Sequence, residues 1–131
     1  MKLLNLLMEN INSDVNKVWS SIKNDVHKRF NDGYATCPYA TNEVVKALKD
    51  KYPITIVDGE YEGGAHWYPV LHDKTLNKKF IVDLGNNIKK RHIESGNIKP
   101  VIVPFPNSDY KTDKLLSVSE WNRFYPKIKK F

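Results

Sequence analysis

Apolar residues recur at steps of three and four between Asn12 and Phe30, the spacing of one face of an α-helix. Asn12 or Ser13 can cap the start of this helix, and loop-forming residues 31–35 follow its end. The pattern predicts an amphipathic first helix with one buried face. That face consists of Val15, Val18, Trp19, Ile22 and Val26.

A second helix is predicted directly after this loop, from about Thr36 to Lys49. Pro38 suits the first turn of a helix, where its missing N–H has no intrahelical role. Pro53 prevents the helix from continuing. Cys37 is therefore expected at the amino-terminal end of this helix. The buried stripe of the helix consists of Ala40, Val44, Ala47 and Leu48.

The apolar pattern changes to that of β-strands after the second helix. Three strands are predicted, over residues 54–57, 65–71 and 79–84, and Asp58-Gly59 is expected to end the first. Residues 98–105 are also apolar, but their prolines restrict them to an edge strand or an extended segment.

The carboxyl-terminal end of the chain predicts one more helix. Ser117 or Ser119 can cap it, and Pro126 would kink or break it. Because helices come first and a meander of strands follows, we expect an α+β fold with N-terminal helices packed on an antiparallel sheet. The length fits a single domain, residues 1–131. The apolar face of the last helix consists of Trp121, Phe124 and Ile128.

The second and third predicted strands are expected to form an antiparallel hairpin. If its tip lies at Lys74-Thr75, His66 lies opposite Asp83 and Tyr68 lies opposite Ile81. Lys-Thr is not a favoured two-residue turn, which favours a longer loop. The other face of the hairpin would be wholly apolar, as packing against a core requires. It would consist of Trp67, Pro69, Leu71, Phe80, Val82 and Leu84.

The composition narrows the class of protein. Hydrophobic residues make up 40% of the chain and charged residues 27%, which is typical of folded globular proteins and excludes a disordered chain. The net charge is +6, but the lysines are scattered, so we interpret most of them as solvated surface. Polar residues interrupt the amino-terminal "MKLLNLLMENIN" too early for a signal peptide, and no apolar run is long enough for a membrane helix. We therefore expect a cytoplasmic protein with no membrane association.

The chemistry of the chain centres on its only cysteine, Cys37, which excludes an internal disulfide and an all-cysteine zinc site. At a helix amino terminus, the macrodipole and unpaired N–H groups favour the thiolate over the thiol. Asp83 is expected to accept the Nδ1–H of His66 and to stabilise the charged ring. An imidazolium activates a thiol through an ion pair. Cys37, His66 and Asp83 are therefore predicted to form one reactive unit.

The order Cys37, His66-Trp67, Asp83 resembles the transglutaminase-like branch of the papain-like cysteine enzymes. The similarity spans roughly residues 33–87, including "CPYATNEVVKALKDKYPITIVDGEYEGG" and "HWYPVLHDKTLNKKFIVDLGNN". In that family a cysteine opens a helix packed on a sheet, a histidine strand follows, and an aspartate lies on the next strand. The resemblance implies a papain-like/transglutaminase-like core with a Cys-His-Asp catalytic triad.

The resemblance also implies functional groups around the triad. Papain-like enzymes often use a side-chain amide upstream of the cysteine as an oxyanion donor, and Asn31 is the best-placed candidate, with Asn24 second. The N–H groups at the helix start, that of Cys37 included, can receive the same oxygen. Tyr34 and Trp67 are candidates to line the substrate groove, although packing is the more ordinary role for Trp67.

The function implied is that of a cysteine-dependent acyl-transfer enzyme, of the peptidase, amidase, deamidase or transglutaminase type. It would act on an amide of a protein or peptide substrate and needs no cofactor. The alternative is an inactive binding or inhibitory module that has the same fold and holds an acidic protein or nucleic acid on its basic surface. Nucleic acid is the less favoured partner, because the sequence has no basic helix or interleaved aromatic platform.

Each member of the predicted triad also has an ordinary structural interpretation. Cys37 would be a small buried hydrophobic residue. His66 would be a satisfied core residue, although Gly63-Gly64 before it could admit a ligand or another backbone. Asp83 would cap the turn at residues 85–87. A zinc site from the same three side chains is a further alternative, although single ligands from three elements lack the close spacing usual for zinc.

Overall fold

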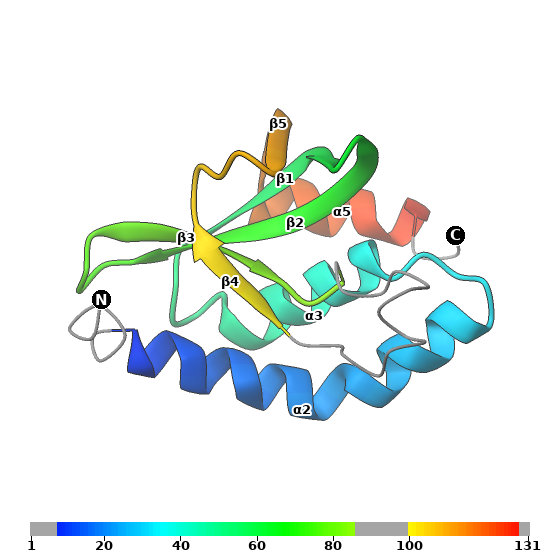
Figure 1. Cartoon of the computed structure of the whole chain (residues 1–131), viewed down its shortest axis with the longest axis horizontal. Helices are drawn as coiled ribbons and strands as arrows, with labels where there is room; N and C mark the ends of the chain where they lie inside the picture. The colour runs from blue at the N-terminus through cyan, green and yellow to red at the C-terminus, as the bar shows by residue number, and fades with distance from the viewer. Residues whose placement is uncertain (1–7, 86–99, 129–131) are drawn as a thin grey trace.

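The computed structural model describes residues 8–85 and 100–128, which form helices against a sheet (Figure 1). These residues contain three helices and a five-stranded antiparallel sheet, which confirms the predicted α+β fold. The helices are α2 (Glu9–Asn31), α3 (Cys37–Leu48) and α5 (Val118–Ile128). The strands are β1 (Ile54–Tyr61), β2 (Gly64–Asp73), β3 (Lys78–Asp83), β4 (Val101–Pro104) and β5 (Tyr110–Ser117).

The two N-terminal helices form where their apolar periodicity predicts them. α3 begins at Cys37, as expected from Pro38 at its second position. α2 begins at Glu9, so the predicted caps Asn12 and Ser13 lie inside the helix. The helix starts earlier than predicted because its apolar face extends back to Ile11, which is fully buried.

α5 begins with a reciprocal capping arrangement. The Oγ of Ser117 accepts a hydrogen bond from the N–H of Glu120 at 3.1 Å, and the carboxylate of Glu120 accepts one from the N–H of Ser117 at 2.9 Å. Ser117 is therefore the N-cap of α5, and it is one of the two caps that the sequence predicted. The helix continues past Pro126 to Ile128, so the predicted break does not occur.

The strand order is β4-β3-β2-β1-β5, so β4 is an edge strand, as its prolines predict. β5 forms the opposite edge and was not predicted. β1 runs through Asp58-Gly59, where the sequence predicted its end. The β1–β5 register shifts between these two residues, and a Cβ at position 59 would lie only 1.8 Å from the carbonyl oxygen of Lys111. Gly59 therefore marks a close approach of two backbones within the strand.

The glycine pair before His66 belongs to the tight turn between β1 and β2. Tyr61 pairs with Gly64, which leaves Glu62 and Gly63 as the turn residues. Both have positive φ, 50° and 82°, as the hairpin turns that match strand twist require. Gly63 is therefore explained by turn geometry.

β2 and β3 form the predicted hairpin in a different register. Val70, rather than Tyr68, lies opposite Ile81, and residues 74–77 form the longer loop that was expected. The predicted pairing of His66 with Asp83 is wrong by two residues. Because the difference is even, each side chain stays on its predicted face. His66 and Asp83 therefore share a face as diagonal neighbours.

The sheet has an apolar cluster on each face. The helices cover one face, and the main core lies between them and the sheet (Figure 1). The sheet contributes the predicted apolar face of the hairpin to this core, including Leu71, Phe80, Val82 and Leu84. The smaller cluster, on the face that carries His66, consists of Val57, Tyr68, Val70, Ile81 and Tyr110.

The sheet is curled over this smaller cluster. β4 and β5 are opposite edges, yet only residues 105–109 connect them. The edges of a flat five-stranded sheet would be about 19 Å apart. The six Cα-to-Cα steps from Pro104 to Tyr110 would reach about 20 Å only if fully extended, but the N–H of Tyr110 donates to the carbonyl of Asn107 at 3.1 Å, so the last three steps fold into a turn. The connection must also turn at both ends, so the edges lie closer together than in a flat sheet. Phe105, at its start, packs against the smaller cluster.

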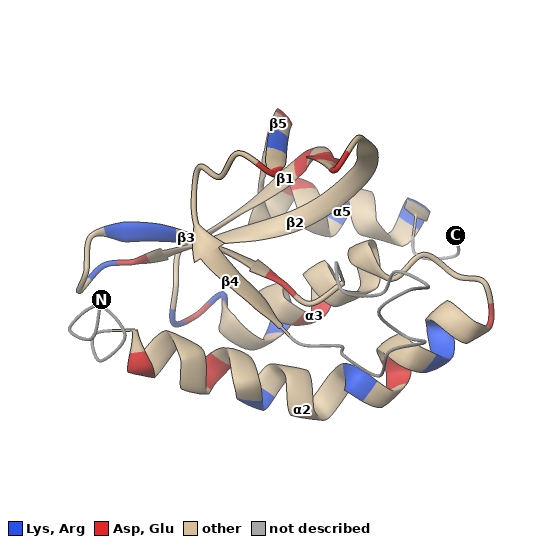
Figure 2. Ribbon diagram, viewed as in Figure 1, with Lys and Arg blue, Asp and Glu red and all other residues tan. Residues whose placement is uncertain are grey.

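Charged residues are interspersed over the described part of the chain. Figure 2 shows both acidic and basic residues along α2, with basic residues also on the β2–β3 hairpin. This distribution agrees with lysines that are mainly solvated surface.

Candidate active site

Cys37 is the first residue of α3 and is partly buried. The first backbone hydrogen bond of the helix runs from the N–H of Ala40 to the carbonyl of Thr36, at 2.9 Å. The N–H groups of Cys37 and Tyr39 therefore precede the intrahelical ladder, and Pro38 has none. The thiol lies where the helix dipole favours an anion.

α3 holds Cys37 next to β2. The hydroxyl of Thr41 donates a hydrogen bond to the carbonyl of Trp67 at 3.3 Å, which attaches the first turn of α3 to the strand. One turn earlier on the same helix face, the side chain of Cys37 lies close enough to the imidazole of His66 to raise its pKa. Two of the three predicted triad residues are thus in contact.

Asp83 lies at the end of β3 and holds the other side of the imidazole. The Nε2 of His66 is 2.6 Å from the Oδ2 of Asp83, and both side chains are buried, with 7% of His66 and 1% of Asp83 exposed. The expectation that Asp83 pairs with Nδ1 is therefore wrong, and Nδ1 is the nitrogen left for Cys37. The structure brings all three predicted triad residues together, with the imidazole between the thiol and the carboxylate.

The second oxygen of Asp83 has a structural role. Oδ1 accepts a hydrogen bond from the N–H of Gly85 at 3.2 Å, as in the predicted capping of the turn after β3. Asn86 and Asn87, the rest of that predicted turn, lie outside the described residues. One carboxylate thus serves both the turn and the imidazole.

The charge state of His66 follows from these contacts. Burial lowers the pKa of the imidazole, but the charge of Asp83, its hydrogen bond and the contact with Cys37 outweigh burial and raise the pKa from the ordinary 6.5 to about 10. The raised pKa favours the imidazolium over the neutral ring. An imidazolium is the form that pairs with a thiolate.

Three tyrosines surround the imidazole, and sequence reasoning missed all of them. The ring centroids of Tyr61, Tyr68 and Tyr110 lie 6.1, 5.9 and 6.2 Å from that of His66. The hydroxyl of Tyr110 also donates a hydrogen bond to the Oδ2 of Asp83 at 2.9 Å. The alternation of β2 could have indicated Tyr68, which shares the face of His66, but no local signal connects Tyr110 with Asp83.

Gly85 is another site residue that the sequence did not indicate. A Cβ at this position would lie 2.7 Å from the Cα of Cys37 and 3.1 Å from its backbone nitrogen. The carbonyl of Gly85 also accepts a hydrogen bond from the hydroxyl of Thr36 at 3.4 Å. The absence of a side chain thus lets the end of β3 pack directly on the start of α3.

The candidate oxyanion donors lie on the α2 side of Cys37. Asn31 is the exposed last residue of α2, and Asn24 is exposed further back on the same helix. Tyr34 is 47% exposed, and the guanidinium carbon of Arg29 lies 5.3 Å from its ring centroid. With Tyr39, Tyr34 lines a hollow of about 380 Å³. The oxyanion role of Asn31 and the groove role of Tyr34 stay predictions.

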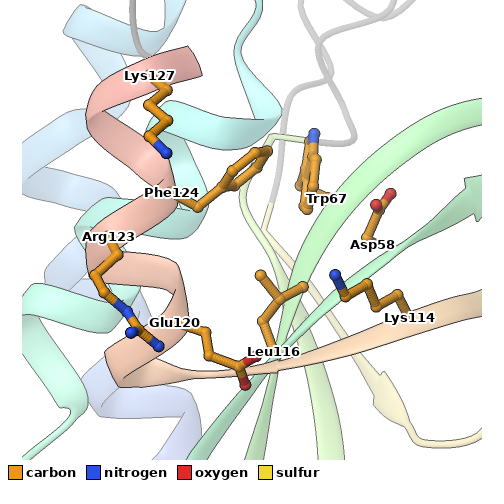
Figure 3. Close-up of a pocket in the computed structure, with 8 residues that line it drawn as sticks. All are labelled: Asp58, Trp67, Lys114, Leu116, Glu120, Arg123, Phe124 and Lys127. Atoms are coloured by element: carbon orange, nitrogen blue, oxygen red, sulfur yellow. The ribbon is translucent and has the colours of Figure 1, made fainter.

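Trp67 mainly packs, as expected. Its ring centroid lies 5.7 Å from that of Trp121 and 5.1 Å from that of Phe124 on α5. The same indole lines a cavity of about 280 Å³ between α5 and the sheet (Figure 3). The remaining residues that line this cavity are Asp58, Lys114, Leu116, Glu120, Arg123, Phe124 and Lys127.

The zinc alternative gains no support. Within residues 8–85 and 100–128, no group of three histidine, cysteine, aspartate or glutamate side chains is arranged to hold a metal ion. In the same ranges, no helix has the length and apolar character needed to cross a membrane.

Comparisons of this chain with protein-family models, curated proteins and solved structures find no match. The chemistry of the site is therefore inferred from its own geometry.

Proposed function

We propose that this protein is a cysteine-dependent acyl-transfer enzyme with a papain-like/transglutaminase-like core and the catalytic triad Cys37, His66 and Asp83. One observation carries the proposal. The buried imidazole of His66 contacts the Cys37 side chain and also lies 2.6 Å from the Asp83 carboxylate. The contact with Cys37 is the arrangement that activates a thiol as a nucleophile.

In the first step the thiolate of Cys37 attacks the carbonyl carbon of an amide, and a C–S bond forms. The carbonyl oxygen becomes an oxyanion, which the backbone N–H of Cys37 and the α3 dipole stabilise. His66 gives its proton to the amine nitrogen as the C–N bond breaks. The products are the free amine and a thioester on Cys37, with His66 left neutral.

In the second step a nucleophile releases the acyl group. Neutral His66 takes a proton from water or an amine, which attacks the thioester carbonyl and displaces the thiolate. Water gives hydrolysis or deamidation, and an amine gives a cross-linked product. Asp83 orients the ring and stabilises its charge throughout. The amide belongs to a peptide backbone, an isopeptide or a glutamine side chain, so the expected partner is a protein or peptide.

The proposal predicts that Cys37 forms an acyl-enzyme with the generic ester p-nitrophenyl acetate. The wild-type protein should give a burst of p-nitrophenol, and mass spectrometry should find one acetyl group on Cys37. Cys37→Ala should give no burst while its free energy of unfolding stays within about 1 kcal/mol of wild type, because the residue is only partly buried.

His66→Ala is the matched control, since it keeps the thiol and removes its partner. Acetylation of wild type no faster than that of His66→Ala would contradict the enzyme proposal and favour the inactive binding module. Unfolding of Cys37→Ala would make the thiol a structural residue, with the same consequence.

A further inference from the structure

The hydroxyl of Tyr110 shares one carboxylate oxygen with the imidazole of His66. It donates to the Oδ2 of Asp83 at 2.9 Å, while the Nε2 of His66 lies 2.6 Å from the same atom. The N–H of Gly85 occupies Oδ1 at 3.2 Å. Three donors from three parts of the chain therefore fix the carboxylate. The phenol binds the same carboxylate oxygen as the imidazole.

Tyr110 reaches Asp83 across the curled sheet. The two residues lie on β5 and β3, which β1 and β2 separate. A flat sheet would put those strands about 14 Å apart, which is beyond a direct hydrogen bond between the two side chains. The bond thus depends on the curl that the short β4–β5 connection imposes.

The phenol ring is held rigidly in this position. Tyr110 is 7% exposed, and its ring centroid lies 4.8 Å from that of Tyr61 and 4.9 Å from that of Tyr68. Its backbone N–H donates to the carbonyl of Asn107 at 3.1 Å, in the turn that opens β5. The contacts of the ring and of the backbone together orient the Tyr110 hydroxyl toward Asp83.

We infer that Tyr110 is a positioning residue of the acyl-transfer site, holding the Asp83 carboxylate aimed at the Nε2 of His66. The inference rests on the proposed function. A hydrogen bond donated to a carboxylate favours its charged form and restricts its rotation. Without the phenol, the Asp83 carboxylate could rotate away from Nε2, and His66 would lose part of the negative charge that stabilises its imidazolium.

The pH dependence of the site involves every titratable group that faces this pair. The imidazole and carboxylate are faced by Cys37 from α3, Tyr61 from β1, Tyr68 from β2 and Tyr110 from β5. Among these, the hydroxyl of Tyr68 donates to the carbonyl of Lys111 at 3.1 Å. Tyr68 therefore offers a control with the same ring chemistry and a hydroxyl directed elsewhere.

The test measures the pH profile of p-nitrophenyl acetate turnover for wild type, Tyr110→Phe and Tyr68→Phe. In Tyr110→Phe the basic limb should move to lower pH, because a carboxylate held less firmly stabilises the His66 imidazolium less. The kcat at neutral pH should fall about tenfold with little change in KM, the order of effect of one hydrogen bond to a charged group. Tyr68→Phe should keep the wild-type basic limb.

A basic limb that moves equally in both variants, or in neither, would overturn the role of Tyr110 and leave the enzyme proposal intact. Absence of acylation in wild type would instead overturn the proposed function itself. A second readout applies even where a variant is unstable. In the wild-type protein, the NMR signal of the His66 Nε2 proton should lie far downfield, as a short bond to a fixed carboxylate requires, and a signal at the position of an exposed imidazole would contradict the inference.

Discussion

A buried imidazole loses its proton unless a negative charge lies close to it. At the residue scale, this balance between burial and charge decides the chemistry of the site. His66 is 7% exposed, so burial alone would make it neutral. Asp83, with a smaller contribution from Cys37, reverses that outcome and raises the pKa of His66 to about 10. The charged ring can then pair with a thiolate on Cys37 and later protonate a leaving amine. The carboxylate therefore acts through the imidazole.

Replacing Asp83 with asparagine should reverse the pH dependence of stability that His66 contributes. In wild type the pKa of His66 is raised above its unfolded value of 6.5, so its stabilisation is complete below that pH and is lost as the pH rises toward about 10. In Asp83→Asn burial dominates and lowers the pKa, so stability should instead be lost as the pH falls through about 6.5. Urea unfolding measured from about pH 5 to about pH 10 tests this reversal.

The matched control for this substitution is Asp73→Asn. Asp73 is also a buried aspartate on the hairpin, but it accepts a hydrogen bond from the N–H of Leu76 at 3.1 Å. This variant should keep the wild-type pH dependence. If Asp83→Asn keeps it as well, the charge of His66 does not depend on Asp83.

At the scale of elements, the site is a junction between the start of α3, the start of β2 and the end of β3. The hydroxyls of Thr36 and Thr41 tie α3 to the carbonyls of Gly85 and Trp67. The junction is tight because Gly85 has no side chain. The placement of Cys37 beside His66 is therefore a consequence of how the helix packs on two strands.

Gly85→Ala should disturb this junction. The new Cβ would lie 2.7 Å from the Cα of Cys37, so either the helix start or the end of β3 must move. We expect a loss of about 1–3 kcal/mol in the free energy of unfolding, as for overpacked cores, together with slower acetylation of Cys37. Urea unfolding and the p-nitrophenol burst measure the two effects.

Gly64→Ala provides the comparison, because a Cβ there lies 3.7 Å from the carbonyl oxygen of Tyr61, an ordinary contact. It should retain acetylation close to that of wild type. Equal behaviour of the two alanine variants would show that Cys37 does not depend on the close approach at Gly85.

At the scale of the whole molecule, the two faces of the curled sheet have different roles. Its helix-covered face holds the main core, while the opposite face encloses His66 and Asp83 among tyrosines. The short connection between β4 and β5 brings Tyr110 over that face. The site is thus completed by residues from both N-terminal and C-terminal parts of the chain.

The sequence predicts the features that depend on local pattern. The periodicity of α2 and α3, the position of Cys37 at the start of α3 and the alternation of the hairpin each follow from neighbouring residues. Alternation also placed His66 and Asp83 on one face, and that prediction survived an error of two in register because the error was even. The choice of Nδ1 failed because register and side-chain reach, which the sequence does not specify, decide which nitrogen meets Asp83.

Local sequence pattern could not predict β5 or its contribution to the site. Its residues 111–115 are all exposed, so the edge strand lacks the alternation that marks a half-buried strand. The bond from Tyr110 to Asp83 joins residues 27 apart in the sequence, across two intervening strands. Only the curl of the sheet, a property of the whole fold, makes that contact.

The central claim is that Cys37 is held as a thiolate by the imidazolium of His66. The most direct measurement is the rate of alkylation of Cys37 by iodoacetamide as a function of pH, in wild type and in His66→Ala. The account predicts rapid alkylation of wild type that is nearly independent of pH from about pH 6 to about 8, and its loss in His66→Ala. A wild-type rate that rises with pH toward about 8.5, like that of a free cysteine, would contradict the claim.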